Sequence, residues 1–142
     1  MPVIKPMVRS NMCLNAHPIG CAKDTMRQIE YAKAKKAERG IKTYKEGGNG
    51  PKTVLVLGCS TGYGLASRIS AAFEYGADTI GVSFEKEGTE TKSGTPGWYN
   101  NLAFDTAAKK EGLVSLTFSA DAFAHSTRAL VIDEVKKLGK KI

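Results

Sequence analysis

A short run in the middle of the chain has the composition and spacing of a phosphate-binding turn. Its sequence is Gly58-Cys59-Ser60-Thr61-Gly62-Tyr63-Gly64, a G-x-x-x-G-x-G pattern. An apolar run precedes it and a helical pattern follows it, which is the context in which such a turn binds a dinucleotide. The free N–H groups and the dipole of the following helix would attract the phosphates. The motif predicts a nucleotide site, against the alternative of a turn that only changes the direction of the chain.

The residues of this turn have separate expected roles. We expect Gly58 to permit the tight turn, Gly62 to let the backbone approach a pyrophosphate, and Gly64 to let the helix pack closely on the strand. Ser60 and Thr61 can add hydroxyl donors. At the second position, Cys59, the turn needs a small residue more than a nucleophile.

An acidic residue ends the next predicted strand, where a dinucleotide-binding fold contacts the ribose. Glu85 follows Gly58 by 27 positions, and its carboxylate can accept hydrogen bonds from the adenosine ribose hydroxyls. A carboxylate there would repel a 2′-phosphate, so it favours NADH over NADPH. The alternative is a solvated acid in an acidic loop. Phe84 beside it is a candidate for contact with the adenine, or a core residue at the strand end.

Asp121-Ala122 follows the third predicted strand, where a doubly wound fold flanks the adenine. A short acid can accept a hydrogen bond from the adenine amino group. An aspartate in an ordinary turn before a helix is an equal alternative. The residues alone do not decide between the two.

Other reactive side chains do not form a catalytic set. Tyr31 and Lys35 have the Y-x-x-x-K spacing of short-chain reductases, but they precede the nucleotide turn, whereas that pair should follow it. His17 and His125 have no nearby partner that would suggest a triad. The three cysteines contain no C-x-x-C pair, so neither a disulfide framework nor a zinc site is expected. We predict no catalytic residue and no metal site within the chain.

The elements that must position these residues alternate regularly after residue 50. Strands are predicted over 53–57, 79–84 and 113–119, with helices over 63–75 and 98–111 and a last helix capped by Ser126. This alternation predicts an α/β fold, a Rossmann-like doubly wound parallel sheet. In that fold the fourth strand lies against the first. The chain ends before it, so we expect an incomplete NAD-binding domain over 51–142, with the substrate and catalytic region absent.

The first fifty residues are predicted to form an arm, a helix and a linker that pack on this domain. Residues 3–14 favour an edge hairpin or arm interrupted by Pro6. Thr25 with Gln28 resembles a capping box that opens a helix through Arg39. The glycine-rich stretch 47–50 then breaks the chain before the first strand of the domain.

Composition and charge narrow the possible partners. Of the 142 residues, 42% are hydrophobic and 25% charged, as in a soluble globular protein. The start lacks a signal peptide and no apolar run is long enough to span a membrane, so we expect a cytoplasmic protein without a membrane partner. The net charge of +7 lies entirely in residues 1–52, without a nucleic-acid-binding motif. We therefore expect a solvated basic helix face and no nucleic-acid partner.

Several strings in the chain resemble the trans-2-enoyl-CoA reductases, a family that includes NADH-dependent enoyl-acyl-carrier-protein reductases of the same type. The strings cover nearly the whole chain in order. They are Lys5-Pro6-Met7-Val8-Arg9, His17-Pro18 with Gly20-Cys21, the run from Val54 to Arg68 around the glycine turn, and Gly97-Trp98-Tyr99-Asn100-Asn101.

The resemblance implies hydride delivery from NADH, in preference to NADPH, to the double bond of a trans-2-enoyl thioester in fatty acid metabolism. The substrate would be an enoyl-CoA or an enoyl-acyl-carrier-protein. By similarity, the cofactor is bound at the pyrophosphate by Gly58, Cys59, Ser60, Thr61, Gly62 and Tyr63, on the adenosine side by Phe84 and Glu85, and at the adenine by Asp121 and Ala122. The resemblance gives residues 98–100 no role beyond packing at a helix start.

The catalytic tyrosine and lysine of the family form a Y-x8-K pair in the second half of its members. None of the five tyrosines here has a lysine nine positions later. We therefore expect the amino-terminal, NADH-binding part of an enoyl thioester reductase, monomeric and inactive by itself. Two alternatives stay open: a non-catalytic dinucleotide-binding or redox-sensing module, and a methyltransferase whose glycine-rich turn holds S-adenosylmethionine.

Overall fold

A computed structural model of the chain describes residues 7–10, 12–14, 16–90, 92–139 and 142. The elements occur in a regular order after an amino-terminal hairpin and a long helix. They are β1 (Met7–Arg9), β2 (Met12–Leu14), α1 (Pro18–Arg39), η1 (Tyr44–Glu46), β3 (Thr53–Leu57), α2 (Gly62–Ile69), the π-helical η2 (Ser70–Glu74), β4 (Asp78–Ser83), α3 (Pro96–Lys110), β5 (Ser115–Ser119) and α4 (His125–Lys137).

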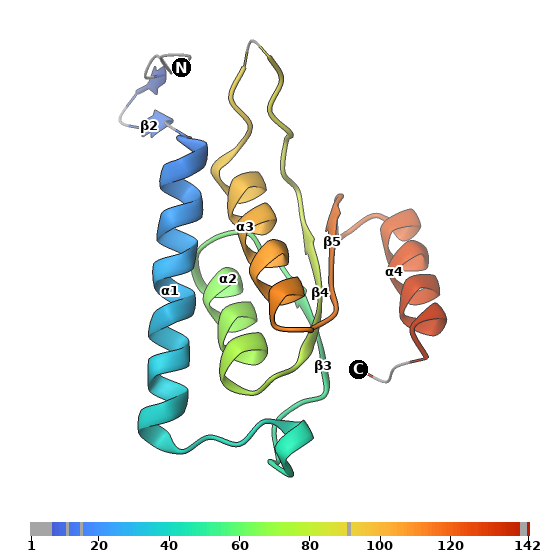
Figure 1. Cartoon of the computed structure of the whole chain (residues 1–142). Helices are drawn as coiled ribbons and strands as arrows, with labels where there is room; N and C mark the ends of the chain where they lie inside the picture. Colours follow the sequence, from blue (N-terminus) through green and yellow to red (C-terminus); the bar gives the residue numbers. More distant parts are fainter. Residues whose placement is uncertain (1–6, 11, 15, 91, 140–141) are drawn as a thin grey trace.

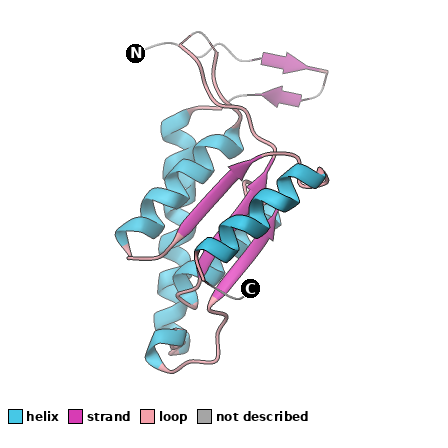
Figure 2. Ribbon diagram, turned by 90° about the vertical axis from the view of Figure 1, so that its right-hand side faces the viewer, coloured by secondary structure: helices cyan, strands magenta, loops and turns pink. Residues whose placement is uncertain are grey.

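The central sheet is parallel, with the strand order β3-β4-β5. Its register pairs Leu57 with Val82 and Val82 with Phe118, so the three carboxyl ends meet at one edge. Helices α1, α2 and α3 lie on one side of the sheet and α4 lies on the other (Figures 1 and 2). This arrangement confirms the predicted Rossmann-like α/β fold.

Strand β3 is largely apolar in sequence but is less buried than β4. Val54, Leu55 and Val56 are half-buried and Leu57 is 60% exposed, whereas every residue of β4 is buried. Within the described residues β3 pairs only with β4, so it forms an edge of the sheet. The apolar run therefore forms a strand, and its position at the edge of the sheet accounts for its partial exposure.

Helix α1 begins earlier than the predicted capping box. His17 is its N-cap and accepts a hydrogen bond from the Gly20 N–H at 3.2 Å, with Pro18 in the first turn. Thr25 lies inside the helix and is fully buried. The capping-box prediction was wrong because the Thr25 hydroxyl donates to Asn100 Oδ1 of α3, at 3.3 Å, instead of capping α1. The predicted end of the helix at Arg39 is confirmed, and Gly40 is its C-cap with a left-handed φ of +63°.

The other helices agree with their predicted positions to within a few residues. The helix predicted over 63–75 is α2 continued by the π-helical turn η2. Helix α3 begins at Pro96, and α4 begins at His125 with Ala124 as its N-cap. The prediction that Ser126 caps the last helix was therefore wrong, because Ser126 already lies in its first turn. The predicted hairpin is present as β1 and β2, while residues 3–6 lie outside the described part.

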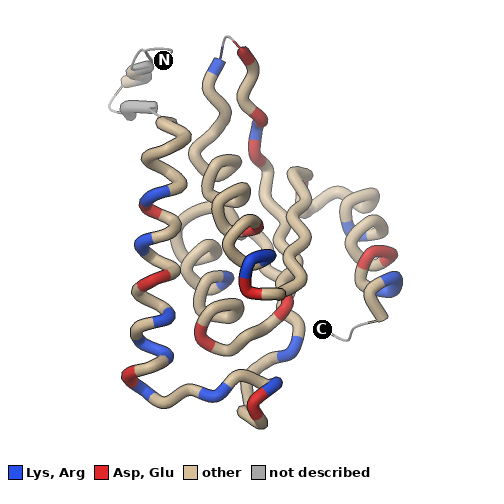
Figure 3. Tube along the Cα trace, in the orientation of Figure 1, with Lys and Arg blue, Asp and Glu red and all other residues tan. Residues whose placement is uncertain are grey.

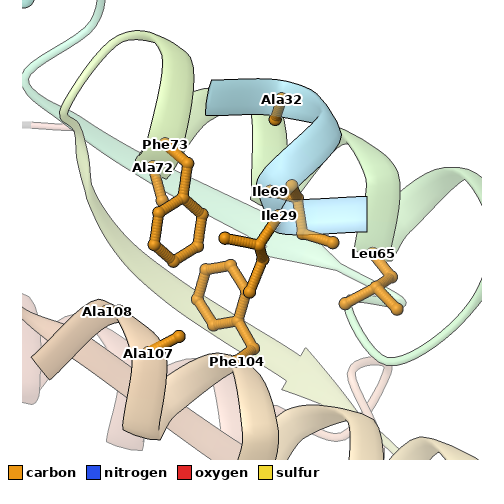
Figure 4. Packing of buried hydrophobic residues seen from close by; sticks show 9 residues of the cluster. All are labelled: Ile29, Ala32, Leu65, Ile69, Ala72, Phe73, Phe104, Ala107 and Ala108. Atoms are coloured by element: carbon orange, nitrogen blue, oxygen red, sulfur yellow. The ribbon is translucent and has the colours of Figure 1, made fainter. Parts of the chain in front are cut away.

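The largest apolar cluster joins α1, α2, η2 and α3 (Figure 4). The rings of Phe73 and Phe104 meet edge to face there, with centroids 5.6 Å apart and planes at 78°, a favoured aromatic geometry. Helix α1 thus packs on other helices as an outer layer. The cluster consists of Ile29, Ala32, Leu65, Ile69, Ala72, Phe73, Phe104, Ala107 and Ala108.

The surface carries the excess positive charge mainly along α1 and the segment after it (Figure 3). Several of these cations form exposed ion pairs, such as Lys33 with Glu111 and Arg27 with Asp24, each at 2.7 Å. Exposed pairs of this kind contribute little to stability. In the part of the chain that the structure describes, no helix has the length and apolar character needed to cross a membrane.

Candidate cofactor site at the carboxyl edge of the sheet

The glycine turn joins β3 to α2 at the edge where the three strands end. Gly58 and Gly62 have φ values of +75° and +52°, a region that side-chain-bearing residues rarely adopt. A Cβ added at Gly64 would lie 1.9 Å from the Gly58 carbonyl oxygen. The turn therefore requires glycine for its conformation at Gly58 and for close packing at Gly64, as predicted.

The first turn of α2 leaves backbone donors at this edge. The first four N–H groups of an α-helix have no partners within the helix, and the N-cap residue Thr61 supplies no side-chain acceptor. Thr61 and Tyr63 are exposed, Tyr63 almost completely at 96%. Unpartnered N–H groups at the positive end of a helix dipole are suited to binding a phosphate.

Two side chains of the turn point into the protein. Cys59 is fully buried, and its thiol donates to Asn101 Oδ1 at 3.6 Å. Burial raises the pKa of the Cys59 thiol, which keeps it protonated and unreactive. Ser60 is also buried, and its Oγ donates to Glu85 Oε1 at 2.5 Å. These two side chains organise the turn, while its backbone faces the edge.

Glu85 follows β4 and is held by groups from three other segments. Its Oε1 accepts from Ser60 of the glycine turn, and its Oε2 accepts from the Thr95 hydroxyl just before α3. At the end of β5, Ser119 Oγ accepts from the Glu85 N–H at 3.1 Å and donates to the Glu85 carbonyl at 2.6 Å. The structure thus places Glu85 beside the glycine turn.

Exposed aromatic residues accompany this edge. Phe84 is 76% exposed, so the alternative that it is a strand-end core residue was wrong. Phe123, which follows Asp121-Ala122 directly, is 90% exposed. Sequence reasoning did not select Phe123, although its place just after the third predicted strand was a usable signal. Both rings are accessible to a planar ligand such as a nucleobase.

Asp121 and Ala122 lie just beyond the end of β5, on the same edge as the turn. Asp121 is exposed, and its Oδ1 accepts from the Phe123 N–H at 2.9 Å, which forms a local Asx turn. Ala122 packs against the apolar cluster under α4. The Asp121 carboxylate accepts this hydrogen bond within its own turn, whereas several segments hold Glu85.

A buried arginine supports the turn from beneath. Arg68 of α2 is completely buried, and its guanidinium lies over the Phe104 ring, 4.3 Å from the centroid. Burial lowers the pKa of Arg68, whereas Cys59 and Asp105 raise it. Its hydrogen bonds join α2 to β4, β5 and α3. Its acceptor in the glycine turn is Cys59 Sγ at 3.7 Å. The other acceptors are Thr79 Oγ1 at 3.2 Å, Thr117 Oγ1 at 2.9 Å, Ser115 Oγ at 3.0 Å, the Leu116 carbonyl at 3.1 Å and Asp105 Oδ1 at 3.2 Å.

The side chains that the sequence analysis rejected as a catalytic set make local contacts. Tyr31 is exposed on α1, and its ring contacts Lys35 as a cation–π pair at 5.8 Å. His17 caps α1, and His125 Nδ1 lies 2.9 Å from Arg128. Among the described residues, no group of three or more His, Cys, Asp or Glu side chains could hold a metal ion.

Two family models match the chain in succession. The NAD(P)H binding domain of trans-2-enoyl-CoA reductase matches residues 3–90, and the trans-2-enoyl-CoA reductase catalytic region matches residues 92–142. The boundary between them falls in the loop before α3. Strand β5 from the second region pairs with β4 from the first, so both regions share one sheet.

Individual proteins with the same description are similar over almost the whole chain. A trans-2-enoyl-CoA reductase [NADH] of Treponema denticola is 64% identical over 139 residues, 98% of this chain and 34% of the relative. An enoyl-[acyl-carrier-protein] reductase [NADH] of Edwardsiella ictaluri is 53% identical over 135 residues, 95% of this chain and 32% of the relative. The chain therefore spans about a third of the length of these relatives.

Solved structures agree with the sequence comparisons. The Treponema denticola trans-2-enoyl-CoA reductase in complex with NAD superposes with a TM-score of 0.89 at 63% identity, over 99% of this chain and 34% of that chain. The Clostridium acetobutulicum trans-2-enoyl-CoA reductase in complex with NADH gives a TM-score of 0.85 at 41% identity, over 99% of this chain and 33% of that chain.

Proposed function

We propose that this chain, which belongs to the trans-2-enoyl-CoA reductase family, is the NADH-binding part of an enoyl thioester reductase. The observation that carries the proposal is the junction of the glycine turn with Glu85 at the carboxyl edge of a parallel sheet. In open α/β sheets this edge is where dinucleotides bind. The relatives whose names specify NADH, and the similar structures with bound NAD or NADH, support the same cofactor.

Each part of the edge has a role in the proposal. The backbone of the turn and the start of α2 bind the pyrophosphate, Glu85 accepts from the adenosine ribose, and Phe84 contacts the adenosine. Asp121 and Ala122 flank the adenine. The full set of proposed cofactor-binding residues is Gly58, Cys59, Ser60, Thr61, Gly62, Tyr63, Phe84, Glu85, Asp121 and Ala122.

Bound NADH would supply the hydride that reduces the trans-2 double bond of an enoyl-CoA or enoyl-acyl-carrier-protein. The residues of this chain hold and orient the cofactor, and we assign none of them a catalytic role. Residues 1–50 act as an arm, helix and linker, and residues 51–142 as the NAD-binding domain. We further propose a cytoplasmic monomer without nucleic-acid or membrane partners.

Family membership does not favour the alternative of a non-catalytic or redox-sensing module, because the similar proteins are named as reductases. It also favours a nicotinamide cofactor over S-adenosylmethionine. Calorimetric titration of the chain with NADH, NADPH and S-adenosylmethionine tests both points. We expect NADH to bind more tightly than NADPH. Binding of S-adenosylmethionine alone would overturn the proposal.

Two substitutions of Glu85 test its role in the choice of cofactor. Glu85→Ala should weaken NADH binding about tenfold, because hydrogen bonds to a charged group are lost. It should also narrow the preference for NADH over NADPH. Glu85→Gln keeps acceptors and size but removes the charge, so it should narrow the preference with a smaller loss of NADH affinity. If both variants keep the wild-type preference, Glu85 does not contact the ribose.

A further inference from the structure

The start of α3 carries polar and glycine residues to which the proposed site assigns no role, yet they meet at Glu85 and the glycine turn. We infer that Thr95, Gly97 and Asn100 are positioning residues that fix the Glu85 carboxylate and the turn, and thereby strengthen the preference for NADH over NADPH. The inference rests on the proposed function and deepens it. Packing of α3 alone would not explain why these three residues meet at Glu85 and the glycine turn.

Thr95 uses its hydroxyl for Glu85 instead of for its own helix. A threonine at the N-cap normally accepts from a backbone N–H of the first helical turn, but Thr95 makes no such bond. Its Oγ1 donates to Glu85 Oε2 and accepts from the Lys86 N–H at 3.0 Å. The Lys86 carbonyl oxygen is a second, more distant acceptor for the Thr95 hydroxyl, at 3.3 Å. The hydroxyl is therefore fixed from one side by the Lys86 backbone and directed at the carboxylate.

Gly97 provides the space in which the carboxylate lies. A Cβ at this position would be 2.1 Å from Glu85 Oε1 and 2.7 Å from Ser60 Cβ. The backbone of Gly97 does not adopt a positive φ, so space is the reason for glycine here. The first turn of α3 therefore contacts Glu85 and Ser60 through its bare backbone. Any larger residue would push one of them away.

Asn100 connects the turn to the body of the protein. Its Nδ2 donates to the Ser60 carbonyl at 2.9 Å, and its Oδ1 accepts from Thr25 Oγ1 of α1 at 3.3 Å. Thr25 is fully buried. The backbone of Ser60 is thus tied through α3 to α1, while its side chain is tied to Glu85.

These contacts leave Glu85 able to accept from a ribose. A carboxylate has about four acceptor positions, and the hydroxyls of Ser60 and Thr95 use one on each oxygen. Each oxygen therefore retains capacity for a ribose hydroxyl. A carboxylate that is already fixed loses less conformational freedom on binding. It also keeps its negative charge where a 2′-phosphate would lie, which discriminates against NADPH by repulsion.

Thr95→Val removes the hydroxyl with little change in shape and is the central test. We expect NADH binding to weaken about fivefold, the usual effect of one lost hydrogen bond. The ratio of NADPH to NADH dissociation constants should fall by about the same factor. Thr95→Ser should restore the wild-type ratio. Thr106→Val is the matched control, because Thr106 lies on α3, the helix that Thr95 caps, and its hydroxyl donates to the Leu102 carbonyl at 2.7 Å within that helix.

The outcomes separate this inference from the proposed function. If Thr95→Val weakens both dinucleotides equally, Thr95 has only a structural role and the inference is overturned. If the unmodified chain binds neither dinucleotide, the proposed function fails for this chain. Amide hydrogen exchange of residues 58–63 then tests positioning without a ligand. Exchange should be faster in Thr95→Val than in Thr95→Ser and Thr106→Val, and unchanged exchange would overturn the inference.

Discussion

The two faces of the β3-β4-β5 sheet are packed by different chemistry. Under α4, Ile80 and Val82 of β4 meet Val131 in a purely apolar cluster. Under α2 and α3, the alternate side chains of β4 and β5 are small or carry hydroxyls, and they surround the guanidinium of Arg68. These residues are Thr79, Gly81, Ser115 and Thr117.

The face under α2 and α3, called the directional face below, is held by hydrogen bonds that require a defined geometry. The face under α4 is held by apolar packing, which has no preferred direction. Hydrogen bonds to a guanidinium require defined positions of their acceptors, so Arg68 fixes α2, β4, β5 and α3 relative to one another. Apolar burial stabilises in proportion to area and tolerates small shifts. The glycine turn and Glu85 lie above the directional face, where several segments hold them. Asp121 leads into α4, and its side chain accepts a hydrogen bond within its own turn.

Arg68→Met should have the largest effect, because it removes the centre of the directional face. Arg68 is completely buried while the Asp105 side chain is 30% exposed. The substitution leaves several acceptors of β4, β5 and α3 without their donor, and each buried polar group left unsatisfied typically costs about 1–3 kcal/mol, which together is a large fraction of the roughly 5–15 kcal/mol by which domains are stable. Urea unfolding followed by circular dichroism measures the change. Under conditions where the variant is folded, we also expect weaker NADH binding, since the turn loses its support.

The double variant Arg68→Met with Asp105→Asn is the control for the ion pair. It should recover part of the lost stability, because Asp105 no longer carries an unpaired charge. If Asp105→Asn destabilises the Arg68→Met variant as much as it destabilises the wild type, the two residues act independently. The directional description of this face would then be wrong.

Ile80→Ala tests the apolar face and should have the second largest effect. Ile80 is 1% exposed, and such truncations typically cost about 2–5 kcal/mol, whereas Ile80→Val should cost about 1 kcal/mol. Once the folded fraction is accounted for, NADH affinity should not change. A change in affinity comparable with that of Arg68→Met would break the distinction between the faces.

Glu46→Gln should have the smallest effect and lies away from both faces. The Thr43 N–H and hydroxyl donate to Glu46 Oε2 at 2.7 and 2.8 Å, with Lys36 at 3.4 Å. These hydrogen bonds, the backbone one first, lower the pKa of Glu46 from 4.5 to about 2. The folded state thus prefers the carboxylate, so its contribution is complete above about pH 4.5 and is lost as the pH falls toward 2.

The difference between wild type and Glu46→Gln should therefore be constant near neutral pH and disappear between about pH 4.5 and 2. Urea midpoints at pH 7, 4 and 2.5 measure it. Thr43→Ala, which removes the hydroxyl donor, should act in the same direction. A difference that does not depend on pH would contradict the lowered pKa.

The arrangement of the glycine turn and Glu85 at the carboxyl edge of the sheet was largely predictable because its signals are local. Glycine at 58 and 64 follows from backbone conformation and close packing, both set within a few residues. The position of Glu85 follows from the end of a strand. Local signals failed at Thr25, whose capping-box pattern was overridden by a contact with α3.

The polar face could not be predicted because its partners are distant in the sequence. Thr79 and Ser83 alternate with Ile80 and Val82, a pattern that usually marks one solvated face. Yet Thr79 is 1% and Ser83 5% exposed. Arg68 and Asn101 come from helices on either side of β4 in the sequence, and they supply the donors that permit this burial.

By itself the sequence determined the alternation of strands and helices, the glycine turn and the place of an acid after β4. All three follow from short-range patterns of hydrophobicity and backbone freedom. Only the tertiary structure decided that Arg68 lies under the turn and that Thr95, Gly97 and Asn100 meet Glu85 and Ser60. Those contacts depend on how α3 packs against a turn about 35–40 positions earlier, and the directions of hydrogen bonds across that distance are set by packing.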